Sequence, residues 1–63
     1  MKRKYAYIFP IGNQLQWSSE TAESLPNRGN NQHDKDLISD FIDANCVGSF
    51  IKLNTGEMVF QIT

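Results

Sequence analysis

Residues 34–45 read Asp-Lys-Asp-Leu-Ile-Ser-Asp-Phe-Ile-Asp-Ala-Asn, and this stretch decides the fold class. Its strongly apolar residues recur at the spacing of one face of an α-helix: Leu37, Ile38, Phe41 and Ile42. Asp34 or Asp36 can cap the start, and aspartates in the first turn complement the positive end of the helix dipole. We therefore predict one amphipathic helix over about residues 35–45.

The polar side of this helix carries three aspartates, Asp36, Asp40 and Asp43. The exposed side of a helix is usually charged, so a solvated face explains them most simply. A docking surface for a basic partner is the alternative interpretation.

Upstream of the helix, residues 4–10 and 14–18 are typical of strands and flank Gly12-Asn13, a good two-residue hairpin turn. With this turn Ile8 lies opposite Trp17. One side of the hairpin then carries Ala6, Ile8, Pro10, Leu15 and Trp17, and the other carries Tyr5, Tyr7, Phe9 and Ile11. Pro10 cannot donate a backbone hydrogen bond, which predicts an edge strand or a bulge at that position.

Downstream of the helix, residues 47–53 and 57–62 predict a second hairpin around Asn54-Thr55-Gly56-Glu57. A two-residue loop, Thr55-Gly56, places Ile51 opposite Phe60 and gathers the apolar residues on one side. A three-residue loop shifts the pairing by one residue and mixes the faces. We favour the first register because of its pattern.

Between the first hairpin and the helix, residues 18–33 are mostly polar, with only Ala22 and Leu25 to bury. We predict a long polar loop with at most one helical turn, near residues 19–24. Such a loop is either mobile in the free protein or a binding element, and its composition does not distinguish the two.

Together these segments predict one domain over residues 1–63, of class α+β: a ββαββ chain forming a mainly antiparallel four-stranded sheet with one helix on one face. A chain of this size buries only about 60% of its unfolded surface, which leaves about 3–5 kcal/mol of net stability. Cys46 is the only cysteine, so no internal disulfide helps. Association with another chain would add stability.

The location expected from the sequence is the cytoplasm. The single cysteine fits a reducing compartment, and no apolar run approaches the ~18 residues of a membrane span. The apolar stretch after Lys2-Arg3-Lys4 is too short for a signal peptide and lacks a cleavage site.

No catalytic, metal or cofactor pattern is present, so we expect no enzyme activity, no metal and no cofactor. His33 is expected to be a solvent-exposed residue before the helix, and Cys46 a small buried filler. A compact enzyme would require His33 and an aspartate to converge in a concave site.

The sheet has two apolar faces and the helix covers one of them, so a partner is expected to cover the other. A symmetric homodimer is the commonest solution, and a different protein is the other. We predict that the Tyr5, Tyr7 and Phe9 side is uncovered, so that truncating Tyr7 and Phe9 abolishes binding without unfolding. In the alternative, these rings form the core and Ile8 and Trp17 face outward.

The function expected is a non-catalytic protein-binding module, homodimeric, that regulates or inhibits a protein by occupying its surface. Short cysteine-poor chains of this kind are frequent among phage and prophage accessory proteins. The expected partner-binding residues are Tyr5, Tyr7, Phe9, Phe50, Asp36, Asp40 and Asp43.

The alternative is a single-stranded nucleic-acid-binding protein, because strand aromatics stack bases and nearby cations hold phosphates. Its residues would be Lys2, Arg3, Lys4, Tyr5, Tyr7 and Trp17. The net charge of −1 argues against it.

Overall fold

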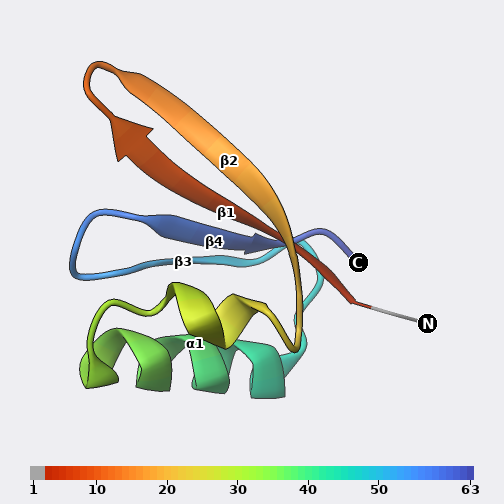
Figure 1. Ribbon diagram of the computed structural model, residues 1–63. Helices are drawn as coiled ribbons and strands as arrows, with labels where there is room; N and C mark the ends of the chain where they lie inside the picture. The colour runs from red at the N-terminus through yellow and green to blue at the C-terminus, as the bar shows by residue number, and fades with distance from the viewer. Residues whose placement is uncertain (1–2) are drawn as a thin grey trace.

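The computed structural model describes residues 3–63 as an antiparallel four-stranded sheet with one α-helix beneath it (Figure 1). The strands run in the order β2-β1-β4-β3 across the sheet. The elements are β1 (Lys4–Ile11), β2 (Gln14–Thr21), the short 3-10 helix η1 (Leu25–Arg28), α1 (Gln32–Ala44), β3 (Phe50–Lys52) and β4 (Met58–Gln61). The predicted ββαββ class is confirmed.

The β1–β2 hairpin has the predicted register, with Ile8 opposite Trp17. Gly12 turns the chain with a φ of 60°, which suits the first central position of a two-residue hairpin loop. β1 is an inner strand, yet β4 pairs only with its residues 5–8. Pro10 lies beyond that pairing, so its missing N–H interrupts no bond to β4.

The β3–β4 hairpin has the other register, so the predicted two-residue loop is wrong. Ile51 pairs with Val59, and Phe50 pairs with Phe60. Three residues, 54–56, form the loop, which is closed by the Leu53 N–H donating to the Glu57 carbonyl at 2.7 Å. Both strands are also shorter than the predicted 47–53 and 57–62.

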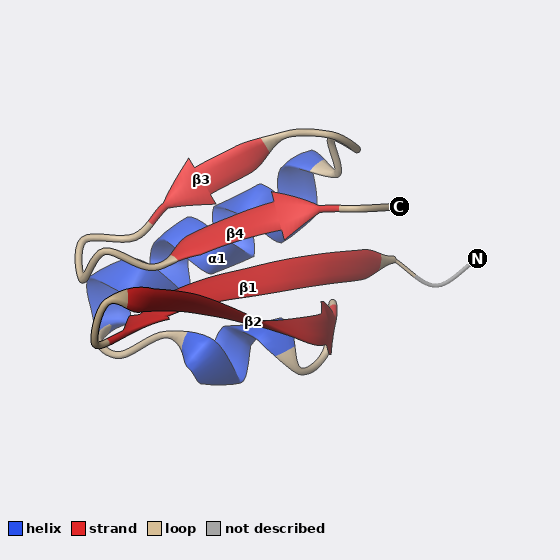
Figure 2. Ribbon diagram, turned by 90° about the horizontal axis from the view of Figure 1, so that it is seen from above, coloured by secondary structure: helices blue, strands red, loops and turns tan. Residues whose placement is uncertain are grey.

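The segment predicted as a loop over 18–33 is largely built into the fold. β2 continues to Thr21, η1 follows, and α1 begins at Gln32, three residues before the predicted start. Leu25 is fully buried, and Figure 2 shows η1 and α1 on the same side of the sheet. The polar composition gave no periodic signal for this segment, because Leu25 is its only fully buried apolar residue and Ala22 only packs against the core from its edge.

Helix α1 is capped at both ends by asparagine. Asn31, not an aspartate, caps its start, because the Asn31 side chain accepts the backbone N–H of Asp34 at 2.9 Å. Asn45 ends the helix in the left-handed conformation, with a φ of 50°. No helix within residues 3–63 is both long and apolar enough to cross a membrane.

The core lies between the sheet and α1. Its buried apolar residues are Tyr5, Tyr7, Leu25, Ile38, Phe41, Leu53 and Val59. The rings of Tyr5 and Phe41 meet edge to face, with centroids 6.0 Å apart, which joins β1 directly to α1.

Candidate functional site

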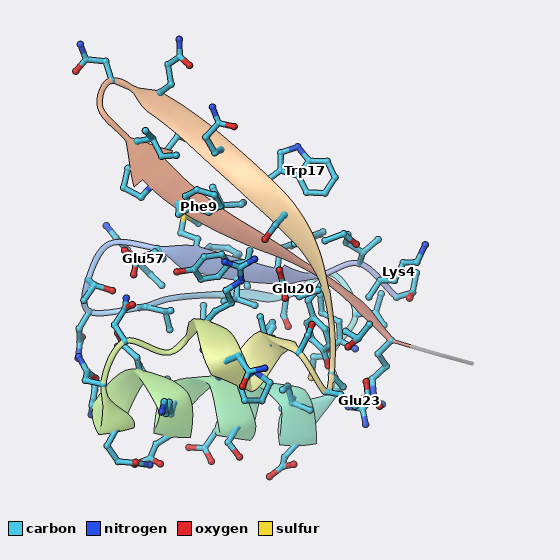
Figure 3. The ribbon with its side chains drawn as sticks, in the orientation of Figure 1. Lys4, Phe9, Trp17, Glu20, Glu23 and Glu57 are labelled. Atoms are coloured by element: carbon cyan, nitrogen blue, oxygen red, sulfur yellow. The ribbon has the colours of Figure 1, made fainter. Side chains whose placement is uncertain are left out.

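The face of the sheet away from α1 carries no second layer among the described residues, and we call it the open face (Figure 1). Alternation along the strands places its apolar side chains: Ala6, Ile8, Pro10, Leu15, Trp17, Phe50, Met58, Phe60 and Ile62. Figure 3 shows Trp17 projecting from β2 on the side away from the helix. Apolar residues gathered on one uncovered face mark a candidate interaction surface.

Four of these side chains are unusually exposed for their size. Leu15 is 74% exposed, Trp17 65%, Phe50 61% and Ile62 40%. They surround the middle of the face, where Ile8, Met58 and Phe60 pack against one another across the strands and are half-buried. The face therefore has a filled apolar centre and projecting apolar side chains around it.

A groove of about 370 Å³ runs over this face. Its lining residues come from β1, β2, β4 and the residue after β4: Ala6, Ile8, Leu15, Gln16, Trp17, Phe60 and Ile62. Gln16 is the single polar side chain among them. Such a groove can accept an apolar side chain, but it offers few groups for binding or transforming a polar substrate.

Among residues 3–63, the only charged residues on the open face are Lys4 and Lys52, which lie at its rim. Lys4 begins β1 at one end of the sheet, and Lys52 is on the edge strand β3. Polar residues of β2, Ser19 and Thr21, continue this rim. An apolar centre inside a polar rim is the usual anatomy of a protein–protein contact.

The prediction that Tyr5 and Tyr7 are uncovered is wrong, because both rings are buried under α1. Phe9 is half-buried and packs beside Tyr7, with centroids 5.5 Å apart. Burial raises the pKa of Tyr7 above its ordinary value, and the nearby charge of Glu57 adds to the shift. Of the predicted aromatic set, only Phe50 is strongly exposed, and it lies on the opposite face.

Glu20 helps to explain why the helix lies on the tyrosine side. Its buried carboxylate accepts hydrogen bonds from Ser18, Ser24 and Arg28. The Arg28 guanidinium also lies over the Tyr7 ring, 5.3 Å from its centroid. Ser24 and Arg28 reach Glu20 only because the chain after β2 passes under this face.

The carboxylate of Glu20 is held in its charged form. Burial opposes ionisation, but the hydrogen bonds from Ser18, Ser24 and Arg28 outweigh it, so the pKa of Glu20 lies below its ordinary value of 4.5. Every partner belongs to β2 or to the segment that follows it. The Glu20 carboxylate therefore connects β2 to the segment that follows it, and we assign it a structural role.

A second polar cluster joins the start of α1 to the β3–β4 loop. The buried Asp34 carboxylate accepts from the Asn54 N–H at 3.2 Å and from the Thr55 hydroxyl at 3.3 Å. Thr55 also contacts Glu57, which accepts from Asn30 at 2.9 Å. Both carboxylates accept hydrogen bonds from neighbouring backbone or side-chain groups. The cluster therefore explains the geometry of the loop, and we do not assign it a catalytic role.

The convergence that an enzyme would require is not seen in the described part of the chain. His33 is exposed, as expected, whereas Asp34 points into the fold. Within residues 3–63 no three His, Cys, Asp or Glu side chains are grouped as metal ligands. Cys46 is exposed, so the expectation of a buried filler is wrong; it follows the left-handed Asn45, where the chain leaves the core.

The three helix aspartates Asp36, Asp40 and Asp43 are exposed, as predicted. The Asp36 carboxylate accepts from the Gln32 amide at 2.9 Å. The only salt bridge described in residues 3–63 joins Arg28 to Glu20, so none of these aspartates is in an ion pair with another residue of that range. They lie across the molecule from the open face, which separates an acidic side from an apolar side with a basic rim.

The residues of the nucleic-acid alternative are not brought together. Lys2 lies outside the described residues, and the Arg3 guanidinium donates to the Ile42 carbonyl at 2.7 Å on the helix side. Tyr5 and Tyr7 are buried and cannot stack bases. Lys4 and Trp17 remain exposed on the open face.

No protein-family model, curated protein or solved structure matches the chain. The functional argument therefore rests on the geometry of the open face. Two signals in the sequence pointed to that face: the cross-strand pairing of Ile8 with Trp17, and the presence of apolar residues on both sides of each hairpin.

Proposed function

We propose that this chain is a non-catalytic protein-binding module that acts as an accessory regulator or inhibitor by covering part of a partner protein. The open face is its contact surface. The observation that supports this proposal is the set of exposed apolar side chains, Leu15, Trp17, Phe50 and Ile62, around a groove of about 370 Å³. A solvated monomer rarely leaves such a patch uncovered.

The chemistry of the face favours a protein over a small polar ligand. Its groove is lined by aliphatic and aromatic side chains with Gln16 as the single polar group. A partner that inserts apolar side chains removes this surface from water, and each square ångström of apolar area so buried contributes about 25 cal/mol. Trp17 is the expected anchor, since tryptophan is enriched among the residues that dominate binding energy.

The helix aspartates form a separate candidate surface. Asp36, Asp40 and Asp43 are exposed on α1, which lies on the opposite side of the sheet from the open face, so a partner on the open face leaves them uncovered. An uncompensated acidic stripe attracts a basic protein over a range of about 8–10 Å at physiological salt. We assign them to the encounter with such a protein and not to the apolar contact.

Site-specific photo-crosslinking in the native cell tests the proposal. A benzophenone amino acid replaces Phe50 in one variant and Val47 in a control; the two native side chains are 61% and 64% exposed, but Phe50 lies on the open face whereas Val47 belongs to no strand of the sheet. We expect a discrete protein adduct from position 50 and none from position 47. Absence of an adduct at position 50, or equal adducts at both positions, would contradict the proposal.

A second candidate function is single-stranded nucleic-acid binding on the same face. It is favoured by one observation: Trp17, Lys4 and Lys52 share a face that carries no Asp or Glu side chain among residues 3–63. Aromatic stacking with lysines at the rim is the arrangement such proteins use. Binding to a single-stranded oligonucleotide that weakens steeply with salt would favour this function, and no binding at low salt would remove it.

A further inference from the structure

We infer that the protein that covers the open face is a second copy of this chain, packed face to face so that two sheets form a sandwich with the helices outside. This inference rests on the proposed function, because it needs the open face to be a protein-contact surface. A second copy on that face would leave the helix aspartates as the surface that meets a regulated protein. Two aligned sheets pack about 10 Å apart with their inner side chains interleaved. Each α1 would then cover the outer side of its own sheet.

The size of the face meets the needs of a stable dimer. Leu15, Trp17, Phe50 and Ile62, at their observed exposures, present on the order of 500 Å² of mostly apolar surface. The half-buried centre and the polar rim extend this area toward the roughly 800 Å² per partner of a standard interface. A sheet face of this size is also a large share of the total accessible surface of 4312 Å².

The face carries both projecting side chains and a hollow. A two-fold contact requires one surface to supply both the projecting groups and the hollows that receive them. Here Trp17 and Leu15 project from β2 directly beside the groove that they help to line. In a face-to-face dimer, the Trp17 ring of one copy could therefore enter the groove of the other copy.

The charges on the face also permit self-association. A two-fold contact that buried an acidic group would bring like charges together, but the carboxylates of Glu20 and Glu57 lie on the helix side. Lys4 and Lys52 are at the rim and exposed, where long side chains can keep their ammonium groups in water. The apolar centre closes without an unpaired buried charge.

The small core gives a reason for association. One layer of helix and one sheet bury seven apolar residues within the described part of the chain. A domain of this size has little apolar burial to offset the loss of chain entropy. A second copy adds a second apolar layer without any change in the first.

Sedimentation velocity across a wide concentration range, with three lysine variants, tests the inference. Leu15→Lys and Phe50→Lys place a charge on the open face, whereas Val47→Lys places the same charge on a similarly exposed residue that belongs to no strand of the sheet. We expect the wild type to approach twice the monomer mass as concentration rises. Leu15→Lys and Phe50→Lys should each raise the dissociation constant at least about tenfold, and Val47→Lys should leave it unchanged. Circular dichroism confirms that each variant is folded.

The outcomes separate this inference from the proposed function. A wild type that stays monomeric at every concentration, or a dimer that both face variants leave intact, overturns the inference. If the chain is monomeric but position 50 crosslinks to a different protein, the proposed function holds and the second copy is excluded. If it is monomeric and position 50 crosslinks to no protein, both fail. Oligonucleotide binding by a monomer that Trp17→Ala abolishes would assign the face to nucleic acid.

Discussion

Glu20 shows at the scale of one residue how a charge contributes to this fold. Its carboxylate is buried, accepts from two serines and forms a salt bridge with Arg28 at 3.0 Å. Sequence inspection missed the pair, because residues 20 and 28 were both assigned to a polar loop, where a carboxylate is normally solvated. Only the path of the chain under the sheet brings the two side chains together.

The lowered pKa of Glu20 predicts an acid-dependent loss of stability. Because the folded state binds this proton more weakly than the unfolded state, the free energy of unfolding should fall as pH drops below about 4.5, the ordinary value, and through the lower folded pKa. Glu20→Gln should reduce this dependence and cost about 1 kcal/mol at neutral pH. Urea unfolding from pH 7 to pH 3 measures both; an unchanged pH slope in the variant would contradict the assignment.

Asn45 offers a second prediction for a single residue. Its backbone is left-handed, with a φ of 50°, and its side-chain oxygen accepts from the Gln61 amide at 2.7 Å. Asn45→Ala should cost about 2 kcal/mol, through both the strained backbone and the lost hydrogen bond. Asn45→Gly removes the bond but keeps the conformation accessible, so it should cost less. Thermal unfolding of the two variants compares them, and equal losses would exclude a backbone contribution.

At the scale of elements, the register of the β3–β4 hairpin depends on a contact from outside it. Asp34, in the first turn of α1, accepts from both Asn54 and Thr55 in the hairpin loop. These bonds fit a three-residue loop in which Gly56 has a φ of 99°. Apolar alternation alone favoured the two-residue loop, because the sequence pattern contains no information about a helix that packs against the turn.

Asp34→Ala should therefore destabilise this hairpin as well as the helix. The variant leaves the Asn54 N–H without its acceptor and removes one of the two acceptors of the Thr55 hydroxyl, which costs roughly 1–3 kcal/mol. Asp36→Ala is the matched control, since Asp36 is exposed on the same helix and should change stability by about 0.5 kcal/mol or less. Chemical denaturation measures the loss, and amide exchange in Gly56 and Glu57 localises it. Equal effects of the two substitutions would contradict a stabilising contact between Asp34 and the β3–β4 loop.

The elements formed by local patterns were predictable, and those formed by contacts distant in sequence were not. The Gly12-Asn13 turn and the alternation around it specify the first hairpin with its register. The apolar spacing specifies α1 and its exposed aspartates. η1 was missed, because Leu25 is an isolated apolar residue whose burial depends on the helix beside it.

For the whole molecule, the decisive question was which face of the sheet the helix covers. Both sides of the first hairpin are apolar, and a period of two residues distinguishes the sides without saying which is inside. The structure buries Tyr5 and Tyr7 and exposes Trp17. One apolar face is uncovered, as predicted, but it is the face that carries Trp17 and not the one that carries Tyr5 and Tyr7.

The assignment of faces predicts opposite results for two aromatic truncations. Tyr7→Ala should remove about 3–5 kcal/mol, comparable to the whole stability of so small a domain, and abolish the native circular dichroism spectrum. Trp17→Ala, measured on dilute protein, should keep the spectrum and lose at most about 1 kcal/mol. A folded Tyr7→Ala variant together with an unfolded Trp17→Ala variant would reverse the assignment.

Trp17 is the only tryptophan in the chain, so its fluorescence tests the open face most directly. With increasing protein concentration its emission should shift to the blue and its quenching by acrylamide should weaken, with the same midpoint as the gain in mass. Phe50→Lys should keep the red-shifted, quenchable emission to higher concentrations. If Trp17 remains equally quenchable in the free chain, at high concentration and in complex with any crosslinked protein, the open face is not the contact surface.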